Sequence, residues 1–220
     1  FSRDSMCLML FASDTISFAG GVGENLSGDA EGATRQALAS AMERLPGPPV
    51  LCLVFPGYRE SGVEALMRTA QKMLGQECPV YGGVAGVDLS NEPGGTQFSP
   101  SGVHRDAVSV LLLAGELRME SIICNSWDPV GYRGVVDEVE GNRVLSISGR
   151  TTLEFYRDIL GPYATPLLEM PLAVFYQGDE RFFLRTGFWH DEDEGSVGYD
   201  TAIPKGSVVQ LTEATPRAIT

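Results

Sequence analysis

The chain has 220 residues, of which 43% are apolar and 20% charged, a composition typical of a globular protein with its own core. Its formal net charge of −13 repels phosphate backbones, and its 16 Lys and Arg residues are scattered, so we expect no nucleic-acid partner. No apolar run reaches the roughly 18 to 20 residues that cross a bilayer, and no signal sequence is visible. We therefore expect a cytoplasmic protein with no membrane partner.

The cysteines lie far apart and match neither a disulfide framework nor a CxxC motif. We interpret all four as reduced thiols of the core: Cys7, Cys52, Cys78 and Cys124. Cys52 lies inside an apolar segment, where a reactive thiolate is disfavoured, and no GxSxG motif marks a serine nucleophile. Local motifs therefore give no sign of nucleophilic catalysis.

Two apolar segments open the chain, Ser5–Ala12 and Thr15–Ala19, and predict a first hairpin. A helix should begin after Asp29, an N-cap residue that precedes a stripe of mostly alanine side chains, and it should end at Pro46. Small side chains let a helix approach a sheet closely, so we expect close contact between this helix and a strand.

The next segments predict a strand, a helix and a second strand. Val50–Phe55 is a short apolar strand, and Ser61 with Glu64 forms a capping box before a helix that Gly75 closes. Pro79–Tyr81 begins the second strand, so this region is a candidate right-handed βαβ unit. An α/β layer is predicted.

After Tyr81 a glycine-rich segment predicts a loop. The pattern then indicates antiparallel strands over Ala107–Leu113, Met119–Cys124, Gly134–Val139 and Arg143–Ile147, with a tight turn at Gly141 and Asn142. A second capping box, Thr151 with Glu154, begins a helix that Gly161 ends. Strand-like segments at 172–176, 181–189 and 208–214 complete the chain.

Motifs for nucleotide or metal binding are weak. Gly21-Val22-Gly23 precedes a helix, but Leu26 stands where a dinucleotide motif needs its third glycine, so we expect a plain connection. The run His190–Glu194 contains metal-ligand residue types, yet adjacent side chains do not converge on one ion, and we interpret it as an exposed acidic turn. His104 is the only other histidine, so a zinc site would need a cysteine or carboxylate brought close by folding.

Two glycine- and aromatic-rich loops combine the features of a pocket for a small polar molecule: Tyr81–Asp88 with Thr96–Phe98, and Asn125–Arg133. Glycines expose backbone N–H groups, aromatic rings offer flat apolar walls, and Arg133 could hold a carboxylate bidentately. The alternative interpretation is an ordinary pair of strand-end loops with a tryptophan buried for packing. The candidate ligand-binding residues are Gly82, Gly83, Asp88, Thr96, Phe98, Trp127 and Arg133.

Three passages resemble the FIST family, sensory modules named for F-box and intracellular signal transduction proteins. They are VYGGVAGVD with the following TQFSPSGVHRDAVSVLLLAG, the block SWDPVGYRGVVDEVEGNRVLSISGRTTLEFYRDILG, and the ending GYDTAIPKGSVVQLTEATPRAI. The resemblance implies an α/β fold of mixed parallel and antiparallel sheets flanked by helices. It also implies a FIST N-like region over 1–144 and a smaller, partial FIST C-like region over 145–220. Relatives continue beyond the position of Thr220, so we expect a shortened version.

The resemblance further implies an intracellular sensory domain of a bacterial signal-transduction system, which binds a small polar metabolite such as an amino acid and is not an enzyme. Its expected partners are a downstream kinase, a cyclic-dinucleotide enzyme or a chemoreceptor module. Some members are linked to haem and nitric oxide, but Cys124-Asn125-Ser126 stands where many relatives have a histidine, which weakens a haem cofactor here.

Two other classes of function stay open as alternatives. One is a protein-interaction module that uses exposed sheet edges and an acidic surface. The other is an enzyme that uses a cysteine or one of the carboxylates near loops, Asp88, Asp106, Asp128 and Asp137.

Overall fold

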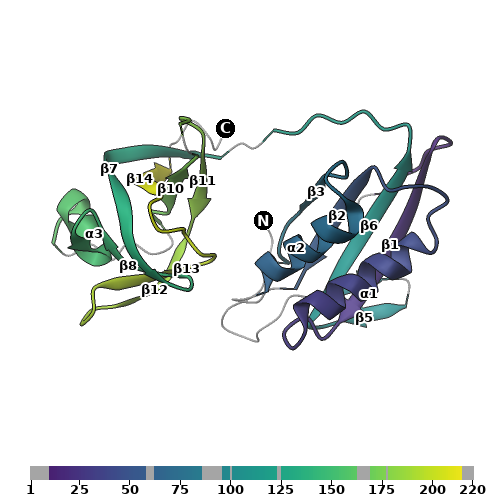
Figure 1. Ribbon diagram of the computed structural model, residues 1–220, viewed down its shortest axis with the longest axis horizontal. Helices are drawn as coiled ribbons and strands as arrows, with labels where there is room; N and C mark the ends of the chain where they lie inside the picture. Colours follow the sequence, from purple (N-terminus) through teal and green to yellow (C-terminus); the bar gives the residue numbers. More distant parts are fainter. Residues whose placement is uncertain are drawn as a thin grey trace. The chain divides into compact units, whose positions relative to one another are not determined.

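The computed structural model describes residues 10–57, 62–85, 96–99, 101–122, 125–162, 169–176 and 178–214. The chain divides into two compact units, Phe1–Glu120 and Ser121–Thr220, and each is described by itself. Parallel and antiparallel strand pairs occur together with three described helices (Figure 1). The predicted α/β fold class is confirmed.

The first unit is built on a four-stranded sheet in the order β1-β6-β2-β3. Its strands are β1 (Ile16–Glu24), β2 (Leu51–Pro56), β3 (Val80–Gly82) and β6 (Ala107–Gly115). β6 pairs antiparallel with both β1 and β2, whereas β3 runs parallel to β2 and is joined to it through helix α2 (Val63–Leu74). The predicted βαβ unit is therefore confirmed, and β1 is an edge strand of this sheet.

Helices α1 (Ala30–Met42) and α2 lie side by side over one face of this sheet (Figure 1). Two glycines of β1 bring α1 close. A Cβ atom on Gly21 would lie 2.0 Å from the carbonyl oxygen of Ala37, and one on Gly23 would lie 1.8 Å from that of Ala33. The predicted close approach of an alanine-lined helix to a strand is confirmed, because any side chain at these glycines would collide with the helix backbone.

The two helices begin in different ways. The Asp29 carboxylate accepts a hydrogen bond from the backbone N–H of Gly32 at 2.8 Å, which confirms the predicted N-cap of α1. At α2 the N-cap is Gly62, with a φ of 106° and no side-chain cap, so the predicted Ser61–Glu64 capping box is wrong. Glycine adopts this left-handed conformation without a Cβ penalty, and its backbone alone turns the chain into the helix. Ser61 itself lies outside the described residues.

A two-stranded hairpin, β4 (Gln97–Ser99) and β5 (Gly102–His104), precedes β6. The turn that follows it is anchored by Asp106, which has a positive φ of 51°. The Asp106 carboxylate accepts hydrogen bonds from the backbone N–H and the hydroxyl of Ser27, at 2.9 and 2.6 Å. The hairpin is thereby held near the connection between β1 and α1.

The second unit is built on an eight-stranded sheet in the order β11-β10-β14-β7-β8-β13-β12, with β9 paired to β8. Its strands are β7 (Trp127–Glu140), β8 (Arg143–Ile147), β9 (Arg150–Thr151), β10 (Leu172–Phe175), β11 (Phe182–Arg185), β12 (Gly187–Asp191), β13 (Ser196–Tyr199) and β14 (Val208–Ala214). The first part of β7 pairs with β14 and its last part with β8, so this strand joins the two halves of the sheet.

Helix α3 (Thr152–Leu160) covers the core of the second unit. Its predicted capping box is confirmed, because Thr151 Oγ1 accepts from the Glu154 backbone and Glu154 Oε2 accepts from the Thr151 backbone. The hydroxyls of Tyr156 and Tyr199 lie 3.1 Å apart in the fully buried interior, and this burial raises the pKa of both phenols.

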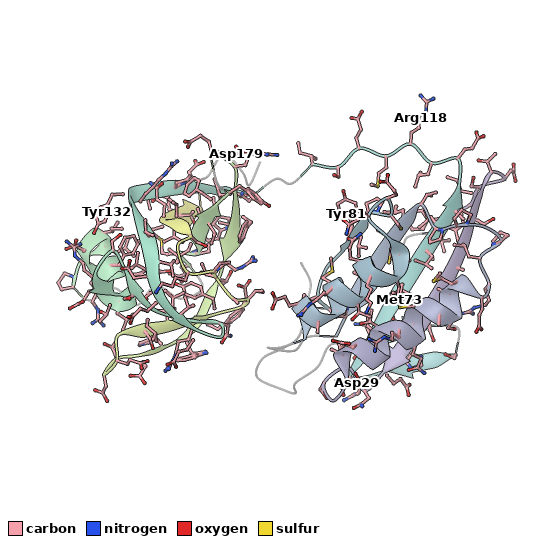
Figure 2. The ribbon with its side chains drawn as sticks, viewed as in Figure 1. Asp29, Met73, Tyr81, Arg118, Tyr132 and Asp179 are labelled. Atoms are coloured by element: carbon pink, nitrogen blue, oxygen red, sulfur yellow. The ribbon has the colours of Figure 1, made fainter. Side chains whose placement is uncertain are left out.

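Tyr132 extends this core along β7 toward α3 (Figure 2). Its ring lies edge-on to Phe155, with centroids 5.5 Å apart, and its hydroxyl donates to Asp158 of α3 at 2.7 Å. Together with the nearby Arg150 guanidinium, this hydrogen bond lowers the pKa of the Asp158 carboxyl.

Most of the predicted strands are confirmed, among them β2, β6, β8, β10 and β14. The predicted opening hairpin is wrong where it can be seen, because residues 10–12 form no strand and β1 pairs with β6. Residues 1–9 lie outside the described part. The predicted strand at Met119–Cys124 is also wrong over 119–122, where two of the four side chains are polar or charged, and its last two residues are not described.

The aromatic segment 127–133, predicted to be a loop, is the first part of β7. Pro129 lies opposite Thr212 of β14, and the register of this pair shifts between Val209 and Leu211. Gly131 has a φ of 70°, the left-handed angle that such a bulge favours. The proline and glycine therefore mark an irregular strand, since the bulge accommodates both residues within the sheet.

Candidate functional site

The predicted ligand-binding residues are distributed over both units. Four exposed residues in or next to β3 and β4 belong to the first unit: Gly82, Gly83, Thr96 and Phe98. Trp127 and Arg133 lie on β7 of the second unit, and Asp88 lies outside the described residues. Gly82 also has a packing role, because a Cβ atom there would lie 1.7 Å from the Val54 carbonyl oxygen. The joint role of these residues in one site stays a prediction.

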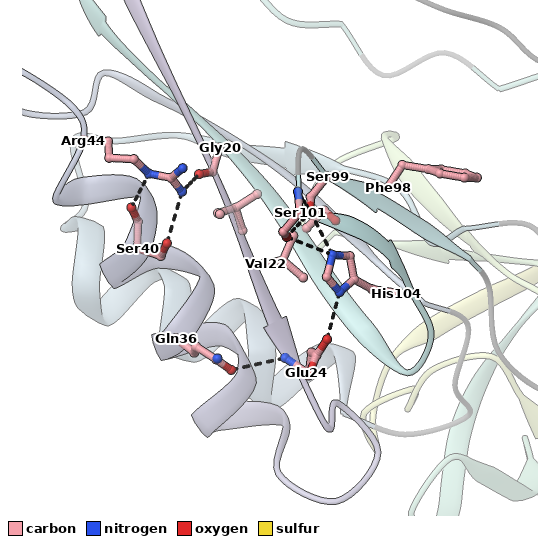
Figure 3. A pocket seen from close by; sticks show the side chains of 13 residues that line it. Gly20, Val22, Glu24, Gln36, Ser40, Arg44, Phe98, Ser99, Ser101 and His104 are labelled. Carbon is pink, nitrogen blue, oxygen red and sulfur yellow. Dashed lines mark hydrogen bonds and ion pairs between the residues drawn. The ribbon is translucent and has the colours of Figure 1, made fainter.

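A cavity of about 710 Å³ runs along β1 in the first unit, between α1 and the β4–β5 hairpin (Figure 3). Of the predicted residues, Phe98 lines it, and its ring is 70% exposed. The floor consists of β1 with its neighbour β6, and the side walls carry mostly polar groups. The polar side chains are Glu24 and Ser109 on the floor, and Gln36, Ser40, Arg44, Ser99, Ser101 and His104 on the walls.

The wall on the helix side is fixed by hydrogen bonds to the edge strand. The Arg44 guanidinium donates to the Gly20 carbonyl oxygen, to the Ser40 carbonyl oxygen at 3.0 Å and to the Ser40 hydroxyl at 3.1 Å. Gln36 Oε1 accepts from the Glu24 backbone N–H at 3.2 Å. These contacts provide hydrogen-bond partners for the Gly20 carbonyl and the Glu24 N–H on the edge strand β1. They also hold the Arg44 guanidinium at one end of the cavity.

The wall on the hairpin side centres on His104, whose side chain is 13% exposed. Its Nδ1 lies 2.8 Å from Glu24 Oε1, and its Nε2 lies 2.8 Å from the hydroxyl oxygen of Ser99 (Figure 3). A carboxylate only accepts hydrogen bonds, so in the neutral imidazole Nδ1 carries the proton and Nε2 accepts from the Ser99 hydroxyl. Ser101 completes the group, with its hydroxyl 2.7 Å from that of Ser99.

The register of the hairpin explains how Ser99 and His104 meet. Gln97 lies opposite His104, and side chains two residues apart on a strand point to the same face, so Ser99 is the diagonal neighbour of His104. Glu24 comes from the end of β1, 80 residues away from the histidine. Sequence reasoning missed this group, because the only local signal was a histidine close to several serines in the segment SPSGVH.

Arg133 lines a second cavity, of about 670 Å³, which lies within the second unit. Its guanidinium stacks over the Phe175 ring, 4.0 Å from the centroid, and donates to both carboxylate oxygens of Glu180. Arg133 was predicted to hold a carboxylate bidentately, and in the structure that carboxylate belongs to the chain itself. A carboxylate ligand would have to displace Glu180, whose side chain is 84% exposed.

Two of the carboxylates considered for acid–base catalysis have structural roles. Asp106 anchors Ser27, and Asp137 accepts a hydrogen bond from the Gly149 backbone at 2.6 Å. The acidic run after His190 forms the turn between β12 and β13, where the Asp191 carboxylate accepts from the backbones of Asp193 and Glu194. Within the described residues no three His, Cys, Asp or Glu side chains are grouped to hold a metal ion.

Haem ligation does not fit the histidine in the first cavity. Both ring nitrogens of His104 already have partners, and an axial bond to iron would require one of these hydrogen bonds to break.

The two described cysteines lie in the core of the first unit, where reaction of their thiols is disfavoured. Cys52 and Cys78 are buried, and burial together with the neighbouring Cys78 raises the pKa of the Cys52 thiol to about 12. We therefore expect that iodoacetamide at pH 8 leaves both thiols unmodified in the folded protein and alkylates both in strong denaturant. Peptide mapping by mass spectrometry measures this, and rapid alkylation of Cys52 under native conditions would contradict the burial and revive a cysteine nucleophile.

The family model described as FIST N domain matches residues 1–150, so the chain belongs to the FIST family, whose members are sensory domains of signal transduction. No curated protein and no solved structure matches. The match extends into the second unit as far as β9, and the predicted boundary between FIST N-like and FIST C-like regions at residues 144 and 145 stays a prediction. None of the described helices is long and apolar enough to cross a membrane.

Proposed function

We propose that the chain is a cytoplasmic sensory domain that reversibly binds a small polar metabolite, such as an amino acid, in the cavity beside β1. The observation that carries this proposal is a cavity of about 710 Å³ whose polar groups are already held in place by the fold. Cavities of roughly 300 to 1,000 Å³ are the usual size for small-molecule sites. Occupancy would be passed to a kinase, a cyclic-dinucleotide enzyme or a chemoreceptor module.

The charged side chains that line the cavity suit a molecule that carries one positive and one negative group. Arg44 provides a fixed cation for a carboxylate, and its Nη1 makes no hydrogen bond to the described residues. Glu24 provides an anion for an ammonium group, since only Oε1 of its carboxylate is used by His104. Phe98 supplies a flat apolar surface for a side chain. Groups held in advance by hydrogen bonds lower the entropy cost of binding.

A thermal-shift screen with amino acids and other small metabolites tests the proposal. A ligand at a hundred times its dissociation constant should stabilise the folded state by about 2.7 kcal/mol, which raises the melting temperature by several degrees. If no compound of the panel changes the melting temperature, a sensory role for the cavity is contradicted.

The location of binding is tested by Phe98→Ala with the strongest hit of that screen. Because this ring is 70% exposed, its loss should leave the fold intact, while the ligand loses an apolar contact and binds about tenfold more weakly, about 1.4 kcal/mol. The matched control is Phe188→Ala, a half-exposed ring of the second unit, which should leave the affinity unchanged. Calorimetric titration measures both, and equal affinities for Phe98→Ala and wild type would place the ligand elsewhere.

A further inference from the structure

We propose that Ser99 is a nucleophile that accepts acyl groups from small activated esters, with His104 as its general base and Glu24 as the positioning residue for the imidazole. The proposal goes beyond reversible binding, although it uses the same cavity. It rests on the linear chain of contacts from Glu24 Oε1 through His104 to the Ser99 hydroxyl, 2.8 Å at each step.

The contacts satisfy the geometric requirements of an activated hydroxyl. A serine is a weak nucleophile unless a base lies within about 2.6 to 3.2 Å of its hydroxyl and a third group orients that base. His104 Nε2 meets the first condition, and the Glu24 carboxylate meets the second, because it fixes the proton on Nδ1. The three side chains come from three different strands, β1, β4 and β5, and the hairpin register brings Ser99 beside His104, so the fold itself assembles them.

Ser99 is the better placed of the two serines beside the imidazole. Its hydroxyl lies 2.8 Å from His104 Nε2, whereas that of Ser101 lies at 3.3 Å. The hydroxyl of Ser99 also accepts a hydrogen bond from the Ser101 backbone N–H at 3.1 Å. This N–H donates to the nucleophilic oxygen itself, and together with the contact to His104 Nε2 it fixes the position of the Ser99 hydroxyl.

Both the environment and the access suit the reaction. The imidazole is mostly buried, so its hydrogen bond to the carboxylate is shielded from water and holds the ring orientation. Ser99, Ser101 and His104 all line the cavity of about 710 Å³, which therefore offers a small acyl compound direct access to the hydroxyl (Figure 3).

The reaction consumes an ester and water. The Ser99 oxygen attacks the acyl carbon and passes its proton to His104 Nε2, and the bond from the acyl carbon to the leaving alcohol breaks. The alcohol leaves with the proton from His104. Water then attacks the acyl carbon on Ser99, and His104 accepts a proton from the water. The bond between the acyl carbon and the Ser99 oxygen breaks, His104 returns the proton to that oxygen, and a carboxylic acid is released.

Labelling with a fluorophosphonate probe, followed by intact mass and peptide mapping, tests the proposal on the full chain. We expect one adduct per chain, on Ser99. Ser99→Ala should abolish the adduct, and His104→Gln should slow its formation by about a hundredfold or more, as for loss of a general base. Glu24→Gln, a change at a side chain that is 65% exposed, should slow it by about tenfold without loss of fold. The control Ser126→Ala changes an exposed serine of the second unit and should react as wild type does.

Circular dichroism and melting temperature confirm that each variant is folded, and Glu24→Gln keeps the test valid if His104→Gln unfolds. An unlabelled wild type, an adduct on another serine, or equal rates for wild type and Glu24→Gln would overturn the proposal. Failure of this proposal is distinct from failure of the sensory function. If metabolites raise the melting temperature but the probe does not label the protein, only the nucleophile proposal is contradicted. If the probe labels Ser99 but no metabolite raises the melting temperature, only the sensory function is contradicted.

Discussion

Replacing Gly23 with alanine is expected to destabilise the first unit by about 3 kcal/mol or more. A methyl group there would lie 1.8 Å from the Ala33 carbonyl oxygen and 2.6 Å from its carbonyl carbon, both of which belong to the backbone of α1. Backbone atoms cannot move aside as the end of a side chain can, so the helix must shift away from the sheet. Overpacking of this kind typically costs about 1 to 3 kcal/mol and occasionally more.

The matched control for Gly23→Ala lies on the same strand. At Gly20 the nearest atom to an added Cβ is the Val110 carbonyl oxygen at 3.5 Å, an ordinary contact, so Gly20→Ala should change stability by less than about 0.5 kcal/mol. Urea titration with thiol alkylation at Cys52 and Cys78 reports on unfolding of this unit, because both thiols are buried in its core. Equal midpoints for the two variants would mean that α1 lies farther from β1 than the structure shows.

Phe155→Ala is expected to destabilise the second unit by about 3 to 5 kcal/mol, the usual cost of truncating a fully buried phenylalanine. This ring is 0% exposed and lies edge-on to both Tyr132 and Tyr156. Gly134 of β7 makes room for it, since a Cβ there would lie 2.7 Å from Phe155 Cε2. No neighbour on the strand can fill the resulting cavity without a shift of β7 or α3.

Tryptophan fluorescence during urea unfolding measures this effect, because both tryptophans of the chain, Trp127 and Trp189, lie in the second unit. Phe188→Ala serves as control, since that ring is 36% exposed and its removal leaves no closed cavity. We expect a change below about 1 kcal/mol for the control. If the urea midpoint of Phe155→Ala is close to that of the control, α3 does not pack on the core as the structure shows.

Local sequence signals predicted the elements whose ends are set by local hydrogen bonds. Asp29 and the pair of Thr151 and Glu154 cap their helices as expected, because a cap needs only a side chain and a backbone N–H three residues away. The alanine stripe of α1 likewise predicted its close contact with a strand. These features depend on short stretches of chain, so a single sequence contains what is needed to find them.

Features that depend on distant pairing were not predictable in the same way. β1 pairs with β6, from the far end of the first unit, and not with the apolar segment before it. Pro129 and Gly131 resemble loop residues until the bulge opposite β14 is known. The group of Glu24, Ser99 and His104 is hidden for the same reason, because its geometry depends on one hairpin register and on a contact between residues 80 positions apart.

A small metabolite is expected to bind beside β1, next to His104. The chain has only two histidines, so protein labelled with ¹⁵N-histidine gives a simple spectrum, and His190→Gln identifies the signals of His104. The metabolite that stabilises the protein most should shift the ring nitrogen signals of His104, which lines the cavity, and leave those of His190 in the second unit unchanged. At saturating ligand, unchanged His104 signals or a shift of the His190 signals alone would contradict this location.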